Sequence, residues 1–230
     1  MTGASRGIGA GTAELLTKRG ARVIGTATRL PEKKTAAVAE WLAVDFSEPA
    51  SLQEFAERLA SIERLDACIN NAGINIIKPL GEVTDEDYRR INAVNLEGPY
   101  RIARAVVPIM QRQGGGRIVN IASIWACTTK SWRSLYSTTK SGLVGMTRSL
   151  AAEFATDGIL VNAVSPGFTL TDLTRASLSD EQMEELSAQV PIRRFAEVYE
   201  IAKVVAFLAS EENTYVTGQN LVADGGFTIV

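Results

Sequence analysis

The stretch Thr2-Gly3-Ala4-Ser5-Arg6-Gly7-Ile8-Gly9 opens the chain and decides its fold. Its three glycines follow the spacing Gly-x-x-x-Gly-x-Gly and lead into a helix predicted over Ile8–Arg19. Glycine allows a tight turn and a close approach of the backbone to a phosphate, and the amino end of a helix favours negative charge. The pattern therefore indicates either a phosphate-binding turn or an ordinary loop before a helix.

Short apolar runs alternate with longer helical segments through the rest of the chain, which is typical of βαβ units and a parallel sheet. The predicted strands are Ala21–Thr26, Trp41–Val44, Asp66–Asn70, Arg117–Ala122, Leu160–Ser165 and Gln219–Ala223. The other predicted helices are Ala50–Glu63, Asp85–Gln113, Leu135–Ala155, Asp180–Gln189 and Glu197–Ser210. We expect one α/β domain over residues 1–230, with a doubly wound parallel sheet and helices on both of its faces.

The strand that normally precedes the glycine turn is absent from the pattern. A doubly wound sheet usually begins with an apolar strand leading into this turn, but here Met1 stands directly before Thr2. Losing such a strand would leave backbone groups of its two neighbours unpaired. We therefore expect the first strand to be missing or truncated, with the natural chain beginning upstream or having been trimmed.

Composition excludes several classes of function. The 230 residues are 46% hydrophobic and 22% charged, as in an ordinary globular protein, and the net charge of −2 gives no reason to expect a nucleic-acid partner. No apolar run suits a membrane span, and no signal peptide is visible. The two cysteines, Cys68 and Cys127, have no metal-ligand spacing, so we expect no metal site and a reducing, cytoplasmic location.

The chain contains no histidine. This excludes Ser-His-Asp and Cys-His catalysis, as well as zinc sites built on histidine pairs. Acid–base chemistry must therefore use tyrosine, lysine, aspartate, glutamate or cysteine. That restriction raises the importance of Tyr136 and Lys140, which stand four residues apart on a predicted helix, where they share one face.

Tyr136 can act as an acid or base only if its proton is easily moved. A phenol has an ordinary pKa of about 10, and a nearby ammonium favours the phenolate, so Lys140 is expected to lower the pKa of Tyr136. Ser123, thirteen residues upstream, would hold the reacting oxygen by a hydrogen bond. A Tyr-x-x-x-Lys pair by itself arises easily by chance and needs further motifs for support.

Those motifs are present. The glycine turn, Asn70-Asn71-Ala72-Gly73, Asn95, Ser123, Tyr136, Lys140 and Pro166-Gly167 occur in an order and spacing that resembles the short-chain dehydrogenase/reductase family from Thr2 to the C-terminus. Within the family, the chain looks most like the 3-oxoacyl-carrier-protein reductase branch. The resemblance implies a Rossmann-type fold and hydride transfer with a nicotinamide cofactor.

The resemblance also implies roles for single residues. Tyr136 would be the general acid in reduction and the base in oxidation, and Lys140 would bind the nicotinamide ribose. Ser123 would polarise the carbonyl, and Asn95 would hold a water for proton relay, although a buried asparagine at a helix kink is the structural alternative. The residues that would contact the cofactor are Gly3, Ser5, Arg6, Gly7, Ile8, Gly9, Thr28, Arg29, Asp45, Phe46, Asn71, Ala72, Gly73, Tyr136, Lys140, Pro166, Gly167, Thr169 and Thr171.

The expected cofactor is NADP(H), with NAD(H) as the alternative. Enzymes that select NAD usually carry an acid at the end of the second strand, where this chain has Thr28 and Arg29. Arg6 in the glycine turn would face the same place, and guanidinium groups suit a 2′-phosphate. Both arginines could instead be solvated surface residues. Asp45 resembles the acid that accepts the adenine amino group, or it caps the following helix near Ser47.

The substrate pocket would be lined by residues between Ser123 and Tyr136 and by a substrate loop over about residues 167–195. Trp125 and Trp132 indicate apolar or ring-shaped contacts, and Arg133 indicates an anionic substituent, with Phe168 from the second stretch. The same residues could pack the rim or a subunit contact. Cys127 is interpreted as a pocket-wall residue and not as a nucleophile.

A carrier-protein substrate is possible but not favoured. Related reductases often place basic residues at the positions of Gly114 and Asp157, and Asp157 has the opposite charge, although Arg112 and Arg148 could compensate. Three hypotheses follow: an NADPH-dependent reductase of a small-molecule carbonyl, which we favour; a dehydrogenase that oxidises a sugar, polyol or other alcohol; and an inactive cofactor-binding regulator. Helices Asp85–Gln113 and Leu135–Ala155 are apolar on more than one face, and the resemblance implies a homotetramer in which they and Gly225–Val230 form contacts.

Overall fold

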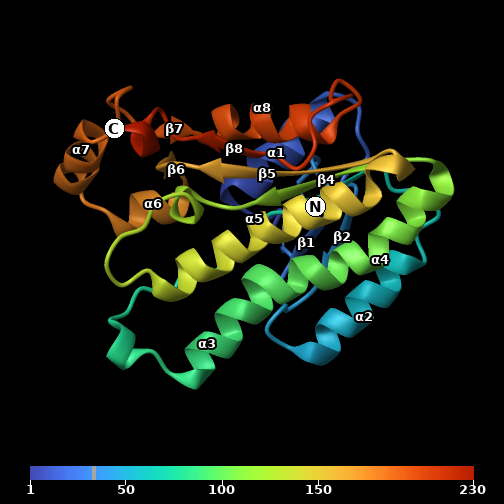
Figure 1. Cartoon of the computed structure of the whole chain (residues 1–230), viewed down its shortest axis with the longest axis horizontal. Coiled ribbons are helices and arrows are strands. Elements are labelled where there is room, and N and C mark those ends of the chain that lie inside the picture. The colour runs from blue at the N-terminus through green and yellow to red at the C-terminus, as the bar shows by residue number, and fades with distance from the viewer. Residues whose placement is uncertain (33–34) are drawn as a thin grey trace.

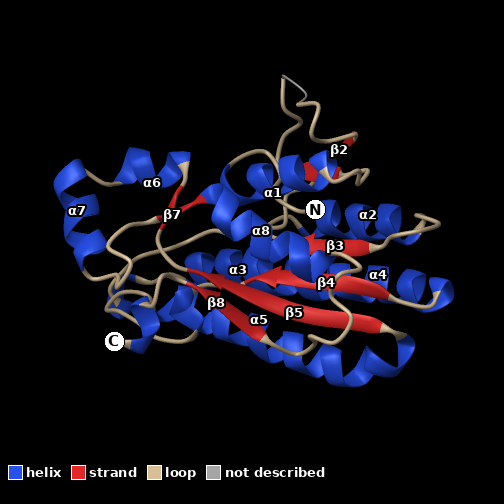
Figure 2. Ribbon diagram, turned by 90° about the horizontal axis from the view of Figure 1, so that it is seen from above, coloured by secondary structure: helices blue, strands red, loops and turns tan. Residues whose placement is uncertain are grey.

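Parallel strands lie at the centre of the molecule, and helices cover them on both faces (Figure 1, Figure 2). The computed structural model describes residues 1–32 and 35–230. The strands are β1 (Ile24–Ala27), β2 (Glu40–Ala43), β3 (Ala67–Asn70), β4 (Gly116–Ile121), β5 (Ile159–Pro166), β6 (Thr169–Leu170), β7 (Ala196–Glu197) and β8 (Asn220–Ala223). The α-helices are α1 (Gly7–Lys18), α2 (Pro49–Ala60), α3 (Asp85–Asn92), α4 (Gly98–Gln113), α5 (Ser134–Phe154), α6 (Asp172–Ser177), α7 (Asp180–Ala188) and α8 (Val198–Ala209).

All strand pairs are parallel. The largest sheet has the order β3-β4-β5-β8, and β1-β2 and β6-β7 form separate pairs. The connections β3–β4, β4–β5, β5–β8 and β6–β7 cross over through helices, as predicted from the alternation in the sequence, whereas the described residues between β1 and β2 form no helix. The α/β fold with a parallel sheet is confirmed.

Met1 and Thr2 lie between β1 and β3 and hydrogen-bond to both. The Met1 nitrogen donates to the Ile24 carbonyl at 2.7 Å, and the Thr2 amide donates to the Ile69 carbonyl at 2.9 Å. These two residues occupy the position of the strand that was expected to be truncated, and they do not form a strand themselves. A cavity of about 30 Å³ lies beside them between the two sheet pieces, lined on its walls by Ile24, Cys68 and other apolar residues.

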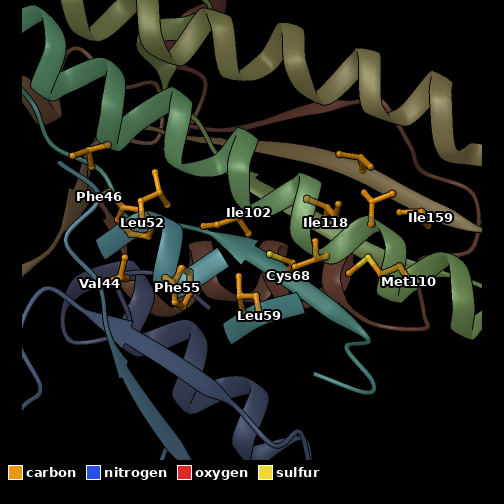
Figure 3. Packing of buried hydrophobic residues seen from close by; sticks show 14 of the residues in the cluster. Val44, Phe46, Leu52, Phe55, Leu59, Cys68, Ile102, Met110, Ile118 and Ile159 are labelled. Atoms are coloured by element: carbon orange, nitrogen blue, oxygen red, sulfur yellow. The ribbon is translucent and has the colours of Figure 1, made fainter. Parts of the chain in front are cut away.

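Two apolar cores pack against opposite faces of the sheet. On one face, α2 and α4 cover β3 and β4 through residues such as Leu52, Ile102 and Ile118 (Figure 3). On the other face, α8 packs on β4 and β5 and also lies against α1. No helix within the described residues has the length and apolar character needed to cross a membrane.

The predicted helix over Asp85–Gln113 is wrong as one continuous element. The structure divides it into α3, a wider π-helical turn over Ala93–Glu97 and α4. Pro99 lacks the amide that would bond back to Asn95, so the regular ladder is interrupted there. The turn carries Asn95, whose side chain bonds to Ile74 in the loop after β3 and to Thr139 on α5.

Candidate active site

The carboxyl ends of β1, β3, β4 and β5 meet at one edge of the sheet, and the sequence motifs stand at these ends. The glycine turn is the first of them. Gly3 and Gly7 have φ values of +61° and +54°, a conformation that favours glycine. A side chain at Gly9 would lie 2.0 Å from the Gly3 carbonyl oxygen, so only glycine fits. Because the three glycines have no side chains, the backbone of the turn stays accessible at the amino end of α1.

The loop after β3 is tied to this turn. The Asn71 side-chain amide donates to the Thr2 and Gly3 carbonyls at 3.1 and 3.0 Å. The Thr2 hydroxyl accepts from the amides of Asn71 and Ala72, both at 2.9 Å. Asn71 therefore braces the turn with its side chain, and Ala72 and Gly73 continue toward the centre of the site.

The predicted phosphate-binding side chains lie in solvent at the same edge. Ser5 and Arg6 are exposed at the start of α1, and Thr28 and Arg29 are exposed directly after β1. Neither arginine forms an ion pair with a carboxylate of the described residues. The Ala4 amide donates to the Thr26 carbonyl at 2.9 Å, which fastens the turn to the strand that carries Arg29.

Asp45 and Phe46 have structural partners of their own. The Asp45 carboxylate accepts from the amide and hydroxyl of Ser47 at 2.9 and 2.6 Å, and these bonds lower the pKa of Asp45. Asp45 therefore stabilises the turn before α2 and does not cap that helix, whose N-cap residue is Glu48. The Phe46 ring is buried against Phe55, with ring centroids 6.1 Å apart, so its side chain belongs to the core and only its backbone is available to a ligand.

Tyr136 and Lys140 occupy one face of α5, as predicted. The Lys140 side chain is buried, and its ammonium lies 5.7 Å from the centroid of the Tyr136 ring. The same ammonium donates to the Ile121 carbonyl at the end of β4 at 2.7 Å. The helix and the central strand thus place the two groups side by side.

Ser123 and Asn95 complete the cluster. Ser123 is buried directly after β4, and its hydroxyl accepts from the Trp125 amide at 3.2 Å. Asn95 accepts from the Ile74 amide and donates to the Ile74 carbonyl, each at 2.9 Å, which fixes its orientation. A side chain at Gly73 would lie 3.4 Å from both the Asn95 oxygen and the Lys140 nitrogen, so the glycine keeps this space open.

Burial dominates the proton affinities of this cluster. It raises the pKa of Tyr136, while the Ser123 hydroxyl and the Arg133 guanidinium act in the opposite direction. Burial also lowers the pKa of Lys140 to about 8. The expectation that Lys140 lowers the pKa of Tyr136 is therefore not met in this state, because removal of the phenol from water has the larger effect.

The segment after β5 closes the site from the other side. Gly167 passes so close to Asp224 that a side chain would lie 2.6 Å from the Asp224 Cα atom. The buried Thr169 hydroxyl donates to the Gly167 carbonyl at 3.1 Å, and Thr171 caps α6. A side chain at Gly7 would lie 3.4 Å from Thr171, so this segment reaches back to the glycine turn.

Aromatic residues form a wall beside the cluster. The Phe168 ring stacks on Phe195 at 5.2 Å between centroids and meets Phe227 edge-on at 5.1 Å. Trp125 meets Phe227 at 6.2 Å, and the Arg133 guanidinium lies 5.3 Å from the centroid of the Trp125 ring. Trp132 is 62% exposed at the outer rim. Cys127 is exposed and accepts from the Asn220 amide at 3.3 Å, as a wall residue would.

Two sets of contacts in and around the site were not predicted from the sequence. A buried chain of hydrogen bonds runs from Asn70 through Asn120 to Thr147, at 2.8 and 2.9 Å, and links β3, β4 and α5. A polar Asn120 within an apolar strand was the available signal. The sequence around Phe195 and Phe227 contains no signal that these two rings pack against Phe168.

The comparisons with known proteins agree with this geometry. A family model described as "Enoyl-(Acyl carrier protein) reductase" matches residues 3–228. The chain is 41% identical over 238 residues to a 3-oxoacyl-[acyl-carrier-protein] reductase from Escherichia coli, covering 100% of this chain and 96% of that protein.

Solved structures of similar architecture include sugar-related enzymes. A candidate NAD(P)-dependent gluconate 5-dehydrogenase from Beutenbergia cavernae, with NADP bound at low occupancy, has a TM-score of 0.89 and 33% identity. The match covers 95% of that protein and 100% of this chain. The aldohexose dehydrogenase of Thermoplasma acidophilum has a TM-score of 0.91 and 30% identity, with 92% and 100% covered.

Proposed function

This chain belongs to the short-chain dehydrogenase/reductase family, and from that membership we propose that it reduces a ketone or 3-oxoacyl-type carbonyl to a secondary alcohol with NADPH. One observation carries the proposal. Ser123, Tyr136, Lys140 and Asn95, which come from three different segments of the chain, lie together at the carboxyl end of the parallel sheet. The 41% identity to a 3-oxoacyl-carrier-protein reductase supports the direction of the reaction.

Each residue of the cluster has a distinct task in this proposal. Bound NADPH supplies the hydride that the carbonyl carbon receives. Tyr136 donates its proton to the carbonyl oxygen, and the Ser123 hydroxyl orients that oxygen. The Lys140 ammonium stabilises the tyrosinate left behind, and Asn95 holds the water through which the proton is replaced. Because burial raises the pKa of Tyr136, the phenol is protonated at neutral pH, as an acid must be.

The residues at the glycine turn fit a dinucleotide. The bare backbone around Gly3, Gly7 and Gly9 suits a pyrophosphate at the amino end of α1, and a Cβ atom at Gly9 has no room. The exposed Arg6 and Arg29 suit a 2′-phosphate, since guanidinium groups form charge-assisted bonds to phosphate oxygens. We infer a preference for NADP(H) over NAD(H).

Oxidation of a sugar or other secondary alcohol is the second candidate function. The structural likeness to a gluconate 5-dehydrogenase and an aldohexose dehydrogenase favours it. The same four residues would then work in reverse, with tyrosinate as the base. A screen of keto-esters, acyl thioesters, quinones and sugar ketones with both nicotinamide cofactors, together with the matching alcohols, would separate the two functions.

The substrate would enter against the segment over residues 167–195, within a single domain. A substrate attached to a carrier protein is the alternative, since the relative from Escherichia coli is named for such a substrate. An acidic carrier would meet Asp157, whose carboxylate accepts from Gln111 at 2.7 Å. We therefore favour a free small-molecule substrate.

A homotetramer in the cytoplasm completes the proposal. A groove of about 590 Å³ runs between α4 and α5, and its lining includes Leu96, Tyr100, Met146 and Leu150. An apolar groove along two long helices suits the matching helices of a second copy. Light scattering should show an oligomer, and a stable monomer would count against this part. In the cytoplasm, thiols such as the exposed Cys127 stay reduced.

The central test is Tyr136→Phe. This variant removes one hydroxyl and keeps the ring, so it should bind NADPH with unchanged affinity and lose turnover by at least about a thousandfold. Fluorescence titration would measure cofactor binding, and NADPH consumption would measure turnover. Retained turnover would overturn the assigned proton donor.

A further inference from the structure

Arg133 is placed as a ligand-binding cation. It stands at the N-cap of α5, three residues before Tyr136, and its side chain makes no cap bond there. Its guanidinium instead lies 5.3 Å from the centroid of the Trp125 ring and close enough to Tyr136 to influence that phenol. Arginine on an aromatic face keeps its donors available at the edges of the plane.

The charge of Arg133 is half-buried and unpaired. Its guanidinium forms no ion pair with any carboxylate in residues 1–32 and 35–230. Six other arginines do have acidic partners: Arg22, Arg58, Arg64, Arg89, Arg101 and Arg194. Burial disfavours a charge that has no partner, and here it lowers the pKa of Arg133. A group from outside the chain would supply the missing counter-charge.

The charged residues Asp224 and Lys78 have partners other than Arg133. Asp224 begins the turn that carries Phe227, and its carboxylate accepts from Gly226 and Thr228 at 2.7–2.9 Å, so it is engaged within its own loop. Lys78, whose amide bonds to the Trp132 carbonyl, is paired through its ammonium with Asp87 at 2.6 Å. Arg133 is therefore the cation that faces the aromatic wall without a partner.

The backbone beside Arg133 is strained. Trp132 has a φ of +67°, in the left-handed region that bulky residues rarely adopt. The ring is 62% exposed, so burial of the ring does not explain this conformation. The conformation turns the chain just before Arg133, and the Lys78 amide holds the Trp132 carbonyl at 3.2 Å. Strain of this kind persists where it positions a functional group.

We propose that Arg133 binds a carboxylate on the substrate, so that the enzyme acts on a short oxo acid in preference to a neutral ketone, ester or thioester. The Arg133 guanidinium lies near enough to Tyr136 to act on that phenol, so a carboxylate bound to it would stand a few bonds from the carbonyl at Tyr136. A single guanidinium matches a single planar carboxylate through two parallel bonds. The aromatic wall of Phe168, Phe227 and Trp125 covers the carbon skeleton between them. This inference rests on the proposed carbonyl reductase activity.

The test compares a carboxylate with its neutral ester. Acetoacetate and methyl acetoacetate share the ketone and differ in charge, and each would be reduced with NADPH by the wild-type enzyme, Arg133→Gln, Arg133→Lys and Lys130→Gln. Lys130→Gln removes an exposed charge from the same loop and serves as the control. We expect Arg133→Gln to lose about 10- to 100-fold in kcat/KM for acetoacetate, mainly through KM, with the ester nearly unchanged. Arg133→Lys should recover part of this loss, and Lys130→Gln should match the wild type.

Other outcomes would distinguish failure of the carboxylate site from failure of the reductase activity. Equal losses on acid and ester in Arg133→Gln, or a wild-type enzyme that prefers the ester, would overturn the carboxylate site while leaving the reductase intact. An equal loss in Lys130→Gln would show that the general charge of the loop matters and would also overturn it. If the wild type consumes NADPH with neither compound nor with any other carbonyl in the screen, the proposed function itself fails.

Discussion

The half-buried Tyr136 and the buried Lys140 lie side by side on α5 next to the end of β4, and removal from water acts on their pKa values in opposite directions. It raises the pKa of the phenol and lowers that of the ammonium to about 8. Below pH 8, the phenol is therefore protonated and Lys140 is charged, which is the combination needed to donate a proton and stabilise the resulting tyrosinate. Above pH 8, Lys140 loses its charge first.

The pH dependence of reduction should follow Lys140. We expect kcat/KM for the ketone to be level near neutral pH and to fall as the pH rises past about 8, because the neutral amine no longer stabilises tyrosinate. Oxidation of the product alcohol should increase with pH, since it needs the phenolate. Lys140→Arg keeps its charge throughout this range and should remove the fall near pH 8. Persistence of the fall in this variant would assign it to another group.

Selection between the two nicotinamide cofactors belongs to Arg6 and Arg29. Replacing both with alanine should raise KM for NADPH about tenfold or more and leave KM for NADH nearly unchanged, because only NADPH carries the 2′-phosphate. Arg22→Ala is a matched control, since this exposed arginine is paired with Glu40 at 2.9 Å. Equal effects on both cofactors would contradict the assignment.

At the scale of elements, the π-helical turn over Ala93–Glu97 positions the site most directly. It interrupts what the sequence predicts as one long helix and points Asn95 at Ile74 and Thr139. The bond to Thr139 is 3.2 Å long and joins this turn to α5, the helix that carries Tyr136 and Lys140. The turn therefore connects two elements that hold the proton-handling groups.

Asn95→Ala should damage both stability and activity. It leaves the Ile74 amide and carbonyl without their partner, which should reduce the free energy of unfolding by about 1–3 kcal/mol in urea. Turnover should fall while NADPH binding is retained. Asn92→Ala is the control, because the side chain of the half-buried Asn92 bonds only within its own helix, to the Tyr88 carbonyl at 2.8 Å. Full activity in Asn95→Ala would remove this residue from the site.

At the scale of the whole molecule, the order of strands and helices could be predicted because each has a clear period and each motif stands at a strand end. The predicted groups at Gly9, Asn71, Ser123, Tyr136 and Lys140 do come together. Contacts between distant loops could not be predicted in the same way. The wall formed by Phe168, Phe195 and Phe227 depends on contacts between segments that are distant in the sequence. The direction of the pKa shift of Tyr136 depends on its burial in the folded protein, which the periodicity of the sequence does not reveal.

The division of the sheet should be visible in amide hydrogen exchange. The β1-β2 pair has few bonds to the rest of the sheet, made through residues 1–4, with a cavity of about 30 Å³ beside them. We expect the amides of β1 and β2 to exchange much faster than those of β4 and β5, which are paired on both sides. Equal protection in both groups would show that the sheet opens as one unit.

The β1-β2 pair, which has few bonds to the rest of the sheet, is followed directly by Thr28 and Arg29, at the place proposed for the 2′-phosphate. The affinity for NADP(H) should therefore depend on local unfolding of this pair. A nucleotide that bridges α1 and the end of β1 binds only when the β1-β2 pair is docked, so part of its binding free energy is spent on docking. At a hundred times its dissociation constant, such a ligand adds about 2.7 kcal/mol to the docked state. NADP⁺ should therefore slow amide hydrogen exchange selectively in β1 and β2 and protect the chain from proteolysis there. The nucleotide would thus stabilise the attachment of β1 and β2 to the rest of the fold.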